Sequence, residues 1–189
     1  MEERKTNGVA PVPAKNMQVA AAILSRIRTA PWFSRVGSKD FGEECHAAVR
    51  SYLSACGFDS GRVRWGASWE ETCAVLRAMD DAAALWPVEE GVRQQAARAA
   101  GSAGRAEMLD SLLNQLSEAG YEWVRPAFAE EELARVASGA LLWTAASAVT
   151  YALAEDLLEE TKNLFLPKLR VFEGGHWPLG IHAGIFLVV

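Results

Sequence analysis

Three histidines, His46, His176 and His182, are the side chains of this sequence best suited to bind a metal ion or to transfer protons. Glu43 lies three residues before His46, and in helical bundles this Glu-x-x-His spacing directs a carboxylate and an imidazole toward one metal ion. Those bundles take a second such pair from another helix, and we identify no second helix that carries one. We therefore interpret Glu43 and His46 as a surface pair in which Glu43 stabilises a helix start. The alternative is a metal-dependent helical enzyme that uses Glu43, His46 and the two histidines near the C-terminus, His176 and His182.

Sequence signatures of the commoner enzymes are missing. The chain contains no GxGxxG or GxxxxGK[ST] nucleotide motif, no GxSxG serine-hydrolase motif, and neither HExxH nor CxxC for zinc. Acidic clusters such as Asp80-Asp81 and Glu155–Glu160 would act as paired catalytic carboxylates only if they converged on a cleft. We interpret them as solvated helix faces. The sequence thus predicts no catalytic residue and no cofactor, and it leans away from an enzyme.

Charge is distributed unevenly along the 189 residues. The net charge is -5, which disfavours a nucleic-acid partner because phosphates require a cationic surface. From Arg4 to Lys39, however, the sequence contains seven basic residues and no acidic one. This segment lies either on the acidic body of the protein itself or against an anionic partner.

Aromatic and basic residues alternate near the end of this cationic segment. In RTAPWFSRVGSK, Trp32 and Phe33 lie between Arg28 and Arg35 in a predicted loop. Tryptophan and arginine often anchor protein interfaces, whereas loop aromatics also fill small helical cores, and both interpretations stay open. We treat Trp32, Phe33 and Arg35 as candidate binding residues for an acidic protein partner.

Helical periodicity dominates the rest of the chain. Half of the residues are apolar, and caps and breaks predict a flexible arm over residues 1–15 followed by one helical domain over residues 16–189. The uncharged stretch from Val136 to Ala154 is long enough to cross a membrane, but its alanine-rich composition and acidic flanks favour a buried central helix and no membrane association. Whether residues 129–166 form one helix or two stays open.

No signal peptide is recognised, and three cysteines without CxxC spacing indicate reduced thiols, so we expect a cytoplasmic protein.

The C-terminal tail changes to alternating and β-branched residues. Over residues 169–189, LRVF is followed by Gly174-Gly175, WPLGI, a turn at residues 182–184, and IFLVV. This pattern predicts a β-hairpin that closes the core, with a strand that needs cover on both faces. The fold class expected is therefore α+β, predominantly α-helical, in one domain with a small C-terminal hairpin. His176, Trp177 and His182 are its candidate binding residues.

The segment GGHWPLG, followed by a small turn and an apolar strand, resembles the C-terminal signature of a group of small uncharacterised bacterial cytoplasmic proteins. The resemblance covers Gly174 to Val188, with Leu179 where that group commonly has cysteine and Ile181 where it commonly has an aromatic residue. It implies an intracellular interaction or immunity-type protein and carries over no catalytic residue. The function expected is thus a cytoplasmic bacterial protein-interaction module; the oligomeric state is not predicted.

Overall fold

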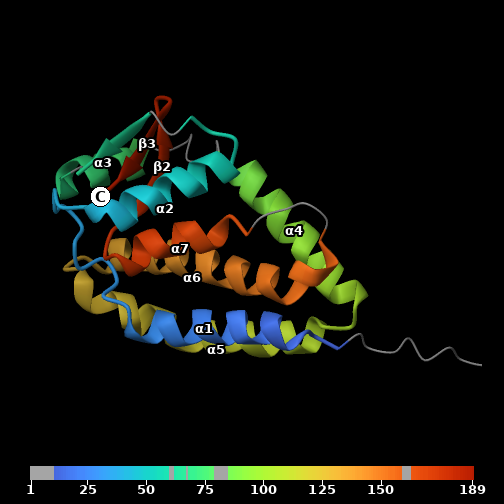
Figure 1. Ribbon diagram of the computed structural model, residues 1–189. Helices are drawn as coiled ribbons and strands as arrows, with labels where there is room; N and C mark the ends of the chain where they lie inside the picture. The colour runs from blue at the N-terminus through green and yellow to red at the C-terminus, as the bar shows by residue number, and fades with distance from the viewer. Residues whose placement is uncertain (1–10, 60–61, 67, 79–84, 159–162) are drawn as a thin grey trace, which may run out of the picture.

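Apolar residues spaced three and four apart fold most of this chain into helices, which account for 68% of it. This computed structural model describes residues 11–59, 62–66, 68–78, 85–158 and 163–189 (Figure 1). Most of the arm expected over residues 1–15 lies outside the described residues, as does the acidic pair Asp80-Asp81. Residues 14 and 15, expected in the arm, already belong to the first helix, and Pro13 occupies its N-cap position.

The elements follow one another as seven α-helices, two 3-10 turns and three short strands in the described residues. They are α1 (Ala14–Thr29), α2 (Gly42–Ala55), β1 (Val63–Trp65), α3 (Trp69–Ala78), α4 (Trp86–Ser102), α5 (Ala106–Val124), η2 (Arg125–Ala127), α6 (Glu131–Ala154), η3 (Glu155–Leu157), α7 (Phe165–Glu173), β2 (Pro178–His182) and β3 (Ile185–Val188).

Helix α6 forms the centre of the fold. It contacts α1 and α5 on one side and α7 on the other, and α4 runs diagonally past its C-terminal half (Figure 1). Most alanines along α6, from Ala134 to Ala154, are almost fully buried, and such small side chains let neighbouring helices approach closely. The predicted buried central helix is confirmed, and so is the α+β, predominantly helical fold class.

By length and composition alone, the segment Glu131–Leu157 could cross a membrane. Yet 67% of its most apolar window is buried by the rest of the protein, which is the pattern of a core helix. The question of one helix or two is also answered, since α6 ends at Ala154 and α7 begins at Phe165.

Helix α5 extends beyond the end that its glycine predicts. The glycine predicts a helix end at Gly120, and the β-leaning residues of YEWVRP after it favour an extended conformation, but α5 continues to Val124. A Cβ atom at Gly120 would lie only 2.2 Å from Leu142 Cδ2. Gly120 is therefore a point of close approach between α5 and α6, and this packing outweighs its low helix propensity.

The C-terminal hairpin is present but shorter than predicted. Residues 169–173, expected in a strand, form the last turns of α7, because Leu169 and Phe172 are buried on one face of that helix. The hairpin itself joins β2 to β3 through Ala183 and Gly184, both at positive φ as a tight two-residue turn requires.

Strand β3 lies in the middle of a three-stranded sheet of order β1-β3-β2. It pairs antiparallel with β2 and parallel with β1, the latter in the register Val63 with Phe186 and Trp65 with Val188. Phe186, Leu187 and Val188 are buried, so the last strand has the cover on both faces that its sequence predicts. The partner strand β1 was not predicted.

Candidate functional site

The loop between α1 and α2 contains three of the predicted binding residues, but it buries two of them. Trp32 and Phe33 are 5% and 3% exposed. Trp32 Nε1 donates a hydrogen bond to the Ile27 carbonyl at 2.6 Å, and the Phe33 ring makes edge contacts with Phe172 and Trp177. Of the two interpretations that the sequence leaves open, burial therefore favours core packing: these aromatic side chains anchor the loop to the core.

Arg35 is exposed beyond this anchor. Its backbone N–H donates to the Gly175 carbonyl at 2.9 Å, which ties the loop to the end of α7. Gly175 has a φ of +86°, and a Cβ atom there would lie 2.8 Å from Ser34 Oγ, so this contact requires glycine. The buried side chains of Trp32 and Phe33 and the hydrogen bond to Gly175 thus hold the backbone at Arg35.

Two of the three histidines gather around one aromatic ring. The His176 ring stacks on Phe41 with centroids 4.5 Å apart, and His46 lies against Trp65, which itself contacts Phe41. His182 lies in β2 beside the hairpin turn, at the other end of the sheet register from Pro178. The fold therefore brings His46 and His176 into one aromatic cluster and does not join His182 to it.

His176 is 1% exposed, and neither ring nitrogen has a hydrogen-bond partner in the described part of the chain. Burial is the main reason that its pKa lies below the usual 6.5, with the positive charge of Arg35 second; the nearby Asp40 and Val189 act weakly in the opposite direction. The neighbouring Trp177 is also buried. Both tail residues thus lie inside the core.

The Glu43 carboxylate is directed to an arginine. Arg50 Nη2 donates to Glu43 Oε1 at 2.6 Å, and this hydrogen bond lowers the pKa of Glu43. The same spacing recurs at Glu173 and His176, but Glu173 pairs with Arg26. Within the described ranges, no group of three or more His, Cys, Asp or Glu side chains is arranged to hold a metal ion. The structure gives the metal-site alternative no support.

A groove with a volume of about 690 Å³ lies between α2 and α7. Its basic residues come from three separate segments of the chain, and the first turns of α2 form the opposite wall. We call it the basic groove; it is lined by Arg26, Arg35, Arg170, Glu43, Glu44 and Glu173, among others.

The charges of the basic groove are only partly paired. Arg26 pairs with Glu173, and Glu43 pairs with Arg50. Arg35 and Arg170 are exposed, and neither side chain makes a hydrogen bond or an ion pair with the described residues. Two guanidinium groups therefore remain available to an acidic ligand, opposed by the single carboxylate of Glu44.

A second polar cluster joins α2, α4 and α7. Glu89 is buried, and its Oε1 accepts from Tyr52 Oη at 2.8 Å and from Lys168 Nζ at 2.6 Å. Lys168 Nζ also lies 5.6 Å from the centroid of the Trp143 ring. Burial first, and the Glu89 charge second, raise the pKa of Tyr52 well above 10 and that of the Cys56 thiol to about 11, so both groups are neutral.

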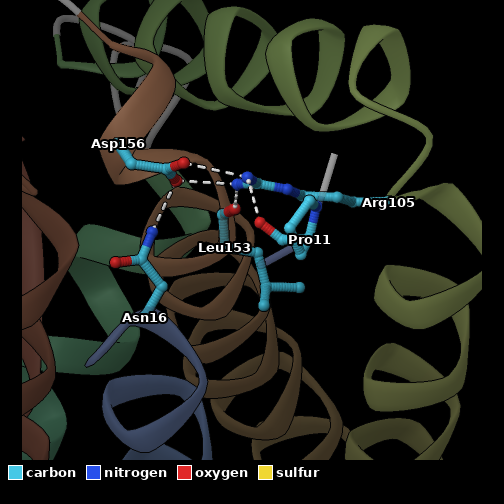
Figure 2. Close-up of polar contacts among 5 residues, drawn as sticks. All are labelled: Pro11, Asn16, Arg105, Leu153 and Asp156. Atoms are coloured by element: carbon cyan, nitrogen blue, oxygen red, sulfur yellow. Dashed lines mark hydrogen bonds and ion pairs between the residues drawn. The ribbon is translucent and has the colours of Figure 1, made fainter. Parts of the chain in front are cut away.

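A third polar cluster joins the start of α1, the connection between α4 and α5, and the end of α6 (Figure 2). Arg105, 2% exposed, makes a bidentate ion pair with Asp156 at 2.7 and 2.8 Å, and Figure 2 shows its guanidinium also donating to the carbonyls of Leu153 and Pro11. Asn16 donates to the same carboxylate at 2.7 Å. Hydrogen bonding to Arg105 lowers the pKa of Asp156. This network fixes the chain before α1 to the ends of α4 and α6.

The sequence does not predict either of these ion pairs. Glu89 is one of two acids at a helix start, and Asp156 belongs to an acidic run that we interpret as solvated. Their partners lie 79 and 51 residues away in the chain. Pairs so distant in sequence leave no local signal.

Comparison with known proteins supplies no relative: no protein-family model, no curated protein and no solved structure matches this chain.

Proposed function

We propose that this protein is a cytoplasmic protein-interaction module, of the interaction or immunity type, that binds an acidic segment of a partner protein in the basic groove. The proposal rests on one observation. Arg35 and Arg170, from segments far apart in the sequence, converge on one groove and have no carboxylate partner among the described residues. Two such arginines match a pair of carboxylates on an extended chain.

The surroundings of Arg35 support recognition rather than chance exposure. Trp32 and Phe33 bury their side chains and hold the loop, while the Gly175 contact fixes the backbone of Arg35 itself. Binding then costs little loop ordering, which is the advantage of a pre-organised site. The aromatic residues therefore contribute by positioning the loop, and the arginines make the contacts.

The net charge of the whole protein favours one kind of acidic partner over another. The net charge is -5, so a strongly acidic partner is repelled by most of the surface and attracted only where arginines gather. Recognition by a local basic groove on an acidic body favours a short acidic segment over an extended polyanion such as nucleic acid.

Fluorescence anisotropy with a labelled decapeptide of alternating Glu and Ala tests the proposal, and the same peptide with Gln in place of Glu is the probe control. We expect the acidic peptide to bind and the Gln peptide to bind at least tenfold more weakly. Arg35→Gln combined with Arg170→Gln should weaken acidic-peptide binding about tenfold, because two charge-assisted contacts are lost.

Arg77→Gln combined with Arg98→Gln is the matched protein control, since it removes the same charge from exposed positions outside the groove. If both double variants lose affinity equally, the attraction is a general charge effect and the groove is not the site.

A further inference from the structure

A second cavity, of about 490 Å³, lies on a different face from the basic groove. Its walls come from α3, α4, α6, α7 and β2 and are mainly apolar. We call it the tryptophan cavity; it is lined by Leu76, Trp86, Val136, Trp143, Lys168 and Leu179, among others. A volume of this size and an apolar lining with few polar groups are typical of sites for small organic ligands.

Large apolar side chains remain exposed around this cavity. Trp86 is 47% exposed and Val136 is 46% exposed. The Trp86 ring lies 4.9 Å from the Trp143 ring at 34°, so the two indoles form a continuous aromatic wall. A half-exposed tryptophan that borders a concave apolar surface is what a bound apolar group would cover.

The wall of the cavity formed by α6 also has open space beside one of its glycines. Gly139 lines the cavity, and a Cβ atom built there would meet nothing within 4 Å. At Gly120 of α5, by contrast, a Cβ atom would collide with Leu142. The glycine at position 139 therefore makes no close helix contact and instead widens the cavity.

One end of the tryptophan cavity is charged. Lys168 and Glu89 both line it, but they differ in how many hydrogen bonds they can still make to a ligand. Oε1 of Glu89 already accepts two hydrogen bonds, from Tyr52 and from Lys168, and the Glu89 side chain is 6% exposed. The Lys168 side chain is 14% exposed, and an ammonium has three donors, of which Glu89 uses one.

We infer that the tryptophan cavity binds an organic monocarboxylate with an apolar or aromatic body, whose carboxylate accepts hydrogen bonds from Lys168 and whose body packs along Trp86, Trp143 and Val136. Glu89 holds the Lys168 ammonium in place by its hydrogen bond, and Trp143 faces the same ammonium. The cavity and the basic groove have no lining residue in common, so this inference is independent of the proposed function.

Isothermal titration calorimetry with three probes of one shape tests the inference: 3-phenylpropionate, 3-phenylpropanol and 3-phenylpropylamine. We expect saturable binding of the acid at micromolar to millimolar concentration and at least tenfold weaker binding of the alcohol and the amine. Equal binding of acid and alcohol, tighter binding of the amine, or no saturable binding of the acid would each overturn the inference.

Two variants locate the binding site. Gly139→Leu fills the cavity without touching the ion pair and should abolish acid binding, whereas Gly91→Leu, on an exposed and open position of α4, should leave it unchanged. Lys168→Gln should remove the preference for acid over alcohol, and Lys168→Arg should restore it. If Lys168→Gln does not fold, the probe series and Gly139→Leu still decide; acid binding that survives Gly139→Leu contradicts the site.

Discussion

The protein contains two ion pairs, each with one buried charged residue, that differ in what surrounds them. Arg105 and Asp156 lie within a closed network in which the guanidinium also donates to two backbone carbonyls (Figure 2). Lys168 and Glu89 lie at the end of a cavity, and the ammonium has donors to spare. In the first pair the donors serve the fold, and in the second they remain available to a ligand.

This difference shows how to separate structural from functional charges without a known relative. A buried charge costs free energy unless it is paired and hydrogen-bonded, so burial alone does not distinguish the two roles. The number of donors already used does distinguish them. Arg105 binds three residues from two other segments of the chain, whereas Lys168 contacts one carboxylate and two aromatic rings.

The largest effect is expected at the closed network. Asp156→Ala leaves the guanidinium of Arg105 buried without a counter-ion, and we expect the free energy of unfolding to fall by about 3 kcal/mol, the lower part of the range for broken buried pairs because Asp156 is 28% exposed. Urea denaturation measures this. Adding Arg105→Met should not restore stability, since the carbonyls of Leu153 and Pro11 then lose their donor. Recovery in the double variant would contradict the structural role.

The open pair should behave differently in the same experiment. Lys168→Met leaves Glu89 with Tyr52 alone, and we expect a loss of about 2 kcal/mol. Lys168→Met combined with Glu89→Gln should recover at least half of that loss, because no buried charge remains and the new amide oxygen can still accept from Tyr52. A double variant as unstable as the single one would contradict this expectation and would show that the Lys168-Glu89 pair, like the Arg105-Asp156 pair, stabilises the fold.

Acid should weaken the closed network progressively. The folded pKa of Asp156 lies below its ordinary 3.8, so below about pH 5 the unfolded chain takes up the proton first and the free energy of unfolding falls with pH. The stabilisation is complete above this range and is lost as pH falls through the folded pKa. Asp156→Asn should therefore differ most from wild type at pH 7 and least near pH 2. A constant difference would contradict this assignment.

The smallest effect concerns His176, a buried polar ring with no hydrogen-bond partner among the described residues. Its folded pKa lies below 6.5, so as pH falls below 6.5 the unfolded imidazole gains a proton before the folded one, and stability decreases. His176→Phe keeps the stacking on Phe41 and should change stability at pH 7 by less than about 1 kcal/mol. It should also flatten the decline between pH 6.5 and 5, as measured by urea midpoints. An unchanged decline would assign the proton uptake to another group.

Most of the helical fold follows from the sequence, because caps and apolar stripes are local signals. Ala30-Pro31 ends α1, and Pro87 lies in the first turn of α4, as predicted. The failures come from tertiary contacts that outweigh local preference. Leu142 fits against Gly120 and carries α5 through a predicted stop, and packing of Leu169 and Phe172 keeps a β-branched stretch helical.

The candidate sites were less predictable than the fold. Arg35 was identified because it lies in a basic segment, but Arg170 carries no such signal and joins the groove only through folding. For the aromatic residues beside Arg35 the sequence leaves core packing and partner contact both open, since sequence alone does not show which side of a loop faces the core, and the structure buries them. The tryptophan cavity combines five segments of the chain and has no local signature.

The order of the strands has a consequence for folding. The middle strand β3 pairs with β1, which lies more than a hundred residues earlier in the chain. Closing so long a loop is slow, whereas the helices and the β2-β3 hairpin form from near neighbours. We therefore expect the β1-β3 pairing to be the last step, with a helical intermediate whose strand β3 has one edge unpaired. Such an edge is prone to join another chain, so refolding at high protein concentration should favour aggregation at this stage.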